Sequence, residues 1–191
     1  MKKLSKLVKD FLDDMGLRPE QTDDEKDFKI GFRGDNGDFS VLITVDDAAR
    51  RIVVHTACPI NVPKERLQAA TELVIRRNCN LGLGSFDIDM DDGFTVFRTG
   101  MKIGRIDLDS ETLLALICGN FWMMDNFLPA IASVVYGNMA PQEAMAMLED
   151  EQGQAKEVPE DSSKQGRPGK QQSADGRTAP KKSQPASPQS H

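Results

Sequence analysis

The sequence predicts an α+β domain, built on an antiparallel sheet, over residues 1–148. Apolar residues recur at helical spacing near the N-terminus and alternate with polar residues between positions 28 and 54. The connections between the alternating segments are short and rich in turn residues, which is typical of antiparallel strands. The expected order of elements is α-β-β-β-α-β-β-α, with helices packed on the sheet.

The first helix is expected up to Met15, because apolar residues between Leu4 and Met15 form one stripe and Gly16 can end the helix in a left-handed conformation. A meander of three strands follows, over 28–32, 39–45 and 52–54. Asn36-Gly37 predicts the first hairpin turn, because both central residues of such a turn need a positive φ.

The second half of the domain is predicted from its turns and helix breakers. The expected elements are, in order, a helix over Pro63–Asn78, strands over 86–90 and 94–101, a long helical region over Glu111–Tyr136 and a short helix over Pro141–Leu148. Asp109 or Ser110 is expected to cap the long region. Pro129 is expected to kink or split it, because proline removes a backbone donor and clashes with the preceding turn.

Residues 149–191 form a tail of different composition, without aromatic residues and with few apolar ones. Such a segment buries too little apolar surface to offset the entropy of ordering its backbone, so we expect it to be disordered. Its charge is divided: residues 149–163 carry six acids and one lysine, whereas 164–191 carry six bases and one aspartate. The tail is either a solubilising extension or a basic arm on an acidic spacer.

Overall charge and cysteine content narrow the class of protein. The net charge is −6, which argues against a nucleic-acid binder except for weak contact through the basic tail. The three cysteines form no CxxC pair, and the thiols indicate a reducing compartment. No uninterrupted apolar run is long enough to span a bilayer, and charges interrupt the N-terminal segment where a secretory leader would be apolar. We therefore expect a soluble, cytoplasmic protein.

No pattern in the sequence indicates catalysis, a cofactor or a metal. His55 is the one histidine of residues 1–148 and lies near Cys58, so a Cys-His dyad is formally possible. A histidine at a strand end beside a packed thiol is the simpler interpretation. The acidic run that begins at Asp87 lacks the glycine and the glutamate of a calcium loop. We expect no catalytic, cofactor-binding or metal-binding residues.

Trp122 is the one residue that suggests a binding surface. At 100° per residue, the apolar residues of the long helix cluster on one side, and Trp122 points away from them. An aromatic ring supplies a large contact area with few rotatable bonds, so Trp122 is interpreted as an anchor for another chain. The alternative is that the helix is covered on both sides within the domain.

The stretch from Val45 to Ala144 resembles the bacterial YbjN-like domain family. The residues that carry the resemblance are Val62-Pro63, Asn78, Gly84-x-Phe86, Asp92-Gly93, Arg98, Tyr136-Gly137 and Pro141-x-Glu143-Ala144. The family is described as sensory-transduction regulators, without catalytic residues to carry over. Its fold is similar to that of type III secretion chaperones, which pair into dimers and hold extended segments of client proteins. The long charged tail departs from the family pattern.

Three functional hypotheses follow. The first is a non-enzymatic interaction module, a homodimer, that binds a partner polypeptide along a strand edge or apolar groove as a chaperone, adaptor or regulator. The second is a small-ligand sensor or enzyme with a pocket between sheet and helices, in which His55, Arg98 and Asp125 would converge. The third is a domain docked on an acidic surface by its basic tail.

Overall fold

A computed structural model describes residues 3–20, 22, 26–79, 81–104 and 108–156. Contacts divide the chain into Met1–Glu157 and Val158–His191, and the fold described is that of the first unit. The helices are α1 (Leu4–Asp14), α2 (Leu67–Asn78, preceded by a 3-10 turn at Lys64–Arg66), α3 (Ser110–Val135) and α4 (Pro141–Lys156). The strands are β1 (Asp27–Arg33), β2 (Asp38–Asp46), β3 (Arg51–Ala57), β4 (Ser85–Ile88) and β5 (Thr95–Lys102).

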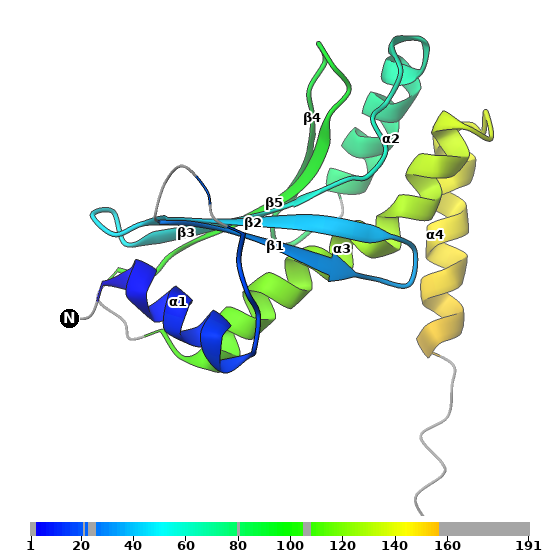
Figure 1. The fold of residues 1–191 in the computed structure, drawn as a ribbon. Coiled ribbons are helices and arrows are strands. Elements are labelled where there is room, and N and C mark those ends of the chain that lie inside the picture. The colour runs from blue at the N-terminus through cyan, green and yellow to red at the C-terminus, as the bar shows by residue number, and fades with distance from the viewer. Residues whose placement is uncertain (1–2, 21, 23–25, 80, 105–107, 157–191) are drawn as a thin grey trace, which may run out of the picture. The chain divides into compact units, whose positions relative to one another are not determined.

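The five strands form one antiparallel sheet in the order β1-β2-β3-β5-β4, so β1 and β4 are its edges. Alternate side chains are buried along each strand; in β2 these are Phe39, Val41, Ile43 and Val45. Helices α1 and α3 lie on the buried side, which we call the covered face (Figure 1). No described helix lies over the other side, the open face, which carries Leu42 and His55. The predicted fold class and element order are confirmed.

Buried apolar side chains form two clusters, and α3 contributes to both. The first joins α1 and strands β1–β3 to the N-terminal half of α3, at Leu113 and Ile117. The second joins α2, α4, β4 and β5 to its C-terminal half, where the rings of Phe86 and Phe127 lie 4.3 Å apart. Phe121 packs against both clusters. Burial of apolar surface therefore holds α3 to the sheet along most of its length.

Pro129, expected to kink or split the long helix, does not split it, because α3 is a single helix with Pro129 inside it. Proline cannot donate to the carbonyl four residues earlier, which here belongs to Asp125. The side-chain amide of Asn36 donates to that carbonyl instead, at 3.1 Å. A partner from the β1–β2 turn thus replaces the missing helical hydrogen bond.

The backbone conformation of the β1–β2 turn, and the contacts that stabilise it, also differ from the prediction. Its central residues are Asp35 and Asn36, and neither these nor Gly37 has a positive φ. The buried carboxylate of Asp125 accepts hydrogen bonds from the backbone N–H groups of Asp35 (3.0 Å) and Asn36 (2.9 Å). Gly34 is required beside them, because an added Cβ would lie 2.4 Å from the Asp125 carboxylate. A tertiary contact, rather than left-handed backbone, stabilises this turn.

The other helix boundaries either agree with those expected from the sequence or lie beyond them. Gly16 has φ 70° after α1, as expected, and Asp109 caps α3 by accepting a hydrogen bond from the N–H of Thr112 (2.7 Å). Helix α4 continues past the expected end at Leu148 to Lys156, and the remaining part of the expected tail, 157–191, lies outside the described residues.

Helix α3 is long and apolar enough to cross a membrane, although no uninterrupted apolar run reaches that length. Half of its most apolar stretch of 18 residues is buried inside the fold. The core helix of a globular domain passes the same test of length and composition. The test therefore does not by itself assign α3 to a membrane.

We predict that Asp125→Ala lowers the free energy of unfolding by about 1–3 kcal/mol, because two backbone N–H groups lose their buried acceptor. Urea denaturation followed by circular dichroism measures the loss. Asp14→Ala, at an exposed position at the end of α1, is the control and should change stability by less than about 0.5 kcal/mol. Equal effects of the two substitutions would contradict the role assigned to Asp125.

Candidate functional site

One side of α3 faces away from the sheet and, after Glu111 in the first turn, carries no charge as far as Met124. The exposed residues on this side, which we call the α3 stripe, are Leu114, Ala115, Cys118, Gly119 and Trp122. No charged residue occurs between positions 112 and 124. The Trp122 side chain is 54% exposed, so it points away from the core as the helical spacing predicts. Its role as an anchor stays a prediction.

A pocket of about 350 Å³ lies beside the α3 stripe, between α3, β5 and the loop before β4. Its apolar lining includes Leu81, Leu83, Phe97, Leu116, Trp122 and Met123. Leu83 is 67% exposed and, with Trp122, offers apolar surface at the pocket. A pocket between sheet and helices was one hypothesis, but local spacing could not identify its lining, because the loop and α3 are more than 30 positions apart in the chain and meet only in the fold.

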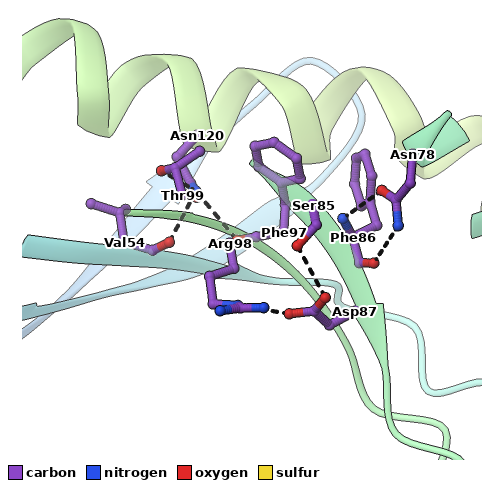
Figure 2. A network of polar contacts seen from close by, with 9 residues as sticks. All are labelled: Val54, Asn78, Ser85, Phe86, Asp87, Phe97, Arg98, Thr99 and Asn120. Atoms are coloured by element: carbon purple, nitrogen blue, oxygen red, sulfur yellow. Dashed lines mark hydrogen bonds and ion pairs between the residues drawn. The ribbon is translucent and has the colours of Figure 1, made fainter. Parts of the chain in front are cut away.

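The polar residues that line the pocket are already bonded to one another. Asn120 is buried and donates through Nδ2 to the Val54 carbonyl (3.0 Å) and to Oγ1 of Thr99 (2.9 Å), as Figure 2 shows. Its Oδ1 accepts a hydrogen bond from the Thr56 hydroxyl (2.6 Å). Because this network satisfies the amide, the pocket is suited to apolar groups rather than to a polar ligand.

A side chain of α2 bonds to the outer edge of β4 at Phe86. The amide of Asn78 accepts a hydrogen bond from the N–H of Phe86 and donates one to its carbonyl, both at 2.8 Å (Figure 2). These are the two bonds that a neighbouring strand would make at this position. Asn78 therefore blocks the edge at Phe86, and the family resemblance at Asn78 and Gly84-x-Phe86 coincides with this contact.

Backbone groups of β1 alternate between facing β2 and facing outward. The hydrogen bond from Gly34 N to Gly37 O (2.8 Å) sets the alternation, because bonded pairs recur at every second position of an antiparallel ladder. The positions that bond to β2 are Phe28, Ile30 and Phe32. The positions that point outward are Asp27, Lys29, Gly31 and Arg33.

The outer edge of β1 is closed at its start and open at its end. The Lys29 carbonyl accepts a hydrogen bond from Glu20 N (2.7 Å), and the hydroxyl of Thr22 bonds to the first carbonyl of the strand. No described residue bonds to the outward backbone groups of Gly31 or Arg33. Space is also open where a Cβ of residue 31 would lie. We call Gly31–Arg33 the open edge of β1.

The three polar residues expected to converge in a ligand pocket do not converge. His55 and Arg98 are paired neighbours on β3 and β5, with side chains on the open face. Arg98 bonds there to Asp87, with 2.7 Å between Nε and Oδ2 (Figure 2). Asp125 lies on the helix that packs on the covered face and is bonded to the β1–β2 turn. This expectation was wrong because it ignored the alternation of side chains across the sheet.

The environments of Cys58 and His55 argue against a catalytic Cys-His dyad. Cys58 is 4% exposed within the second core cluster, and burial raises the pKa of its thiol to about 11. A thiol with this pKa is protonated near neutral pH and is a weak nucleophile. His55 belongs to the open face instead, and its Nδ1 has no hydrogen-bond partner among the described residues.

The acidic run after β4 is used within its own turn. Asp89 accepts a hydrogen bond from the N–H of Asp91, and Asp92 accepts one from the N–H of Phe94, both at 2.8 Å. Across the described ranges, no three His, Cys, Asp or Glu side chains gather in a way that could hold a metal ion.

Residues 5–123 match the family model of YbjN, described as "Putative bacterial sensory transduction regulator". The match spans more than half of the chain, so the chain belongs to the YbjN family. It includes the first helix and the meander, which the sequence motifs did not single out. No match to a curated protein is found.

Solved structures with a similar fold include two chains from complexes and one from this family. A chain of the HopA1-SchA chaperone-effector complex is 18% identical, with 65% of this chain and 91% of that chain covered and a TM-score of 0.44. A chain of the ExsC-ExsE complex is 14% identical, with 66% of this chain and 92% of that chain covered and a TM-score of 0.43. YbjN, "a putative transcription regulator from E. coli", is 12% identical, with 79% of this chain and 92% of that chain covered and a TM-score of 0.42. These likenesses are too distant to transfer a property to this chain.

We predict that His55 makes the fold less stable at mildly acidic pH. Burial, followed by the charge of Arg98, lowers the pKa of His55 in the folded chain, whereas the unfolded chain keeps the ordinary value of about 6.5. The unfolded state therefore binds the proton more readily, and stability falls as the pH drops through about 6.5. Urea denaturation between about pH 8 and pH 5.5 measures the slope.

His55→Gln is the matched variant, because glutamine keeps a polar side chain on the open face without titrating. Its stability should fall less over the same pH range. Identical slopes for the two proteins would show that His55 does not contribute to the pH dependence.

Proposed function

We propose that this chain is a non-enzymatic protein-binding adaptor or regulator of chaperone type, acting in the cytoplasm, and that it holds an extended segment of a partner polypeptide at the open edge of β1. The observation that carries this proposal is the difference between the two edges of the sheet. At β4, Asn78 occupies the backbone groups of Phe86. At β1, the outward groups of Gly31 and Arg33 have no described partner.

An added strand would find both main-chain and side-chain contacts at this edge. Main-chain hydrogen bonds give affinity in strand addition, and the side chains on the two faces give selectivity. On the covered side the partner would meet Phe32, whose ring stacks on Phe121 at 5.3 Å between centroids. On the open side it would pass Gly31, which offers no side chain, so the partner backbone can approach closely. The regulatory description of the YbjN family supports a binding role of this kind.

A second candidate function is the binding of a small apolar ligand. The pocket beside the α3 stripe favours it, because about 350 Å³ lies within the range of ligand sites. A thermal-shift screen with apolar metabolites tests this candidate separately, since a ligand there would raise the melting temperature without contacting β1.

We predict that Gly31→Pro weakens partner binding about tenfold or more while the chain still folds. Proline removes the outward N–H, and an edge position whose N–H faces solvent tolerates proline. Gly31→Ala is the matched control, because it keeps the N–H and its Cβ meets no atom within 4 Å. Affinity purification with the full chain, with proteins quantified by mass spectrometry, compares the three forms.

A partner held by strand addition is lost with Gly31→Pro and retained with Gly31→Ala. Partners retained equally by both variants would contradict binding at the open edge of β1. Circular dichroism of each variant shows whether the sheet is intact before binding is compared.

A further inference from the structure

The open edge of β1 is blocked at one end by the chain itself. Glu20 pairs with Lys29 in an antiparallel bridge, so the residues before Glu20 lie toward the end of β1. The same register would place Arg18 opposite Gly31, but no described hydrogen bond joins the two. The chain instead turns back to α1, where the N–H of Leu17 donates to a carbonyl of the last helical turn (2.9 Å). An added strand that reaches Gly31 therefore meets this segment.

The other end of the open edge leads past the tip of the β1–β2 hairpin. After Arg33 the chain turns into β2, and the backbone N–H groups of the turn bond to Asp125 on α3. A bound segment can continue in this direction, but it must end or leave the sheet at Gly31. If the segment runs antiparallel to β1, the end that lies beside Arg18 is its C-terminus. If it runs parallel, that end is its N-terminus.

We propose that the open edge of β1 holds the C-terminal residues of a partner polypeptide, with the terminal carboxylate beside Arg18. This inference rests on the proposed function and adds the chemistry of the partner. Arg18 is exposed and has no ion-pair partner among the described residues. Its charge attracts a carboxylate and repels the amine that a parallel segment would place there. Antiparallel pairing is also slightly more stable than parallel pairing.

Two of the three acidic side chains that lie nearest to Arg18 in the sequence are already paired. The carboxylate of Glu20 lies 2.8 Å from the Lys29 ammonium, and that of Asp13 lies 2.9 Å from the Lys9 ammonium. Asp14 alone of the three has no described partner. The Arg18 guanidinium therefore remains available to an incoming carboxylate.

In this register the last residue of the partner faces Gly31. The N–H of Gly31 donates to one oxygen of the terminal carboxylate, and the Gly31 carbonyl accepts a hydrogen bond from the last N–H of the partner. The other carboxylate oxygen accepts from the Arg18 guanidinium, and bonds between charged groups are stronger than neutral ones. No atom lies within 4 Å of where a Cβ of residue 31 would be, so the last side chain has room on the open face.

The penultimate residue of the partner faces Phe32, on the covered side of the sheet. The ring of Phe32 stacks on Phe121, and Phe121 in turn meets the edge of Phe39 with 5.5 Å between centroids. An apolar or aromatic penultimate side chain would extend this row of rings and bury more of Phe32. Residues 157–191 of this chain contain one valine, three alanines and no aromatic residue, so we assign the occupant to another molecule.

Peptide display with the full chain as bait tests the proposal. One library presents random segments of about ten residues that end in a free carboxylate, and a second presents the same segments followed by a polar extension that moves the carboxylate away. Peptides should be enriched from the first library only. Apolar or aromatic residues should predominate at their penultimate position.

An enriched peptide is then synthesised as the free acid and as the C-terminal amide, and its binding is measured by fluorescence anisotropy. The amide should have a dissociation constant at least about tenfold higher, because it loses the charged contact. Arg18→Ala should weaken binding of the acid by a similar factor and leave that of the amide unchanged, whereas Arg18→Lys should restore part of the affinity. Lys64→Ala, which removes an exposed cation before α2, is the matched control and should change neither.

Gly31→Pro separates this inference from binding at the open edge of β1. Equal binding of acid and amide, with both lost in Gly31→Pro, would overturn the role of the carboxylate alone. Equal enrichment from the two libraries, or an effect of Arg18→Ala no larger than that of Lys64→Ala, would do the same. Binding that survives Gly31→Pro, or no enrichment from the free-carboxylate library, would overturn the inference entirely.

Discussion

The placement of α3 across the sheet is the constraint on which the rest of the structure depends. Apolar packing in both core clusters holds the helix down, but polar contacts at two points fix its rotation and position. Asn120 ties it to β3 and β5, and Asp125 ties it to the turn between β1 and β2. A one-residue rotation would remove both buried groups from their partners at a cost of several kcal/mol. These contacts also decide that Trp122 faces outward.

In the same arrangement the two faces of the sheet differ in helix coverage, and its two edge strands differ in hydrogen bonding. Helices cover one face of the sheet, and the side chain of Asn78 completes the hydrogen bonding of β4 at Phe86. An unpaired strand edge invites pairing with other chains, and proteins normally block it. The contrast between β4 and the end of β1 supports the view that the open edge of β1 has a function. The α3 stripe lies on a helix rather than on a strand edge, so two separate surfaces remain for contact with other molecules.

Much of the fold follows from local patterns, whereas the candidate sites do not. Alternation and helical spacing predict the elements, because burial on one face imposes the same period on the sequence. The contacts of the turn at Asp35 were predicted wrongly, and the sequence left open whether Pro129 splits α3, since both depend on a contact between residues about 90 positions apart. Trp122 could be predicted as exposed from its angle on the helix. The pocket beside it and the closure of β4 by Asn78 arise from tertiary packing, and local spacing cannot reveal them.

Amide hydrogen exchange of the full-length, isotope-labelled chain, followed residue by residue by NMR, tests this account most directly. The N–H groups of Asp35 and Asn36 lie in a surface turn, yet their bonds to Asp125 predict that they exchange slowly. The N–H of Gly31, on the same hairpin, is predicted to exchange at nearly the rate of an unfolded chain. Rapid exchange at Asp35 and Asn36 together with strong protection of Gly31 would contradict both the placement of α3 and the open edge of β1.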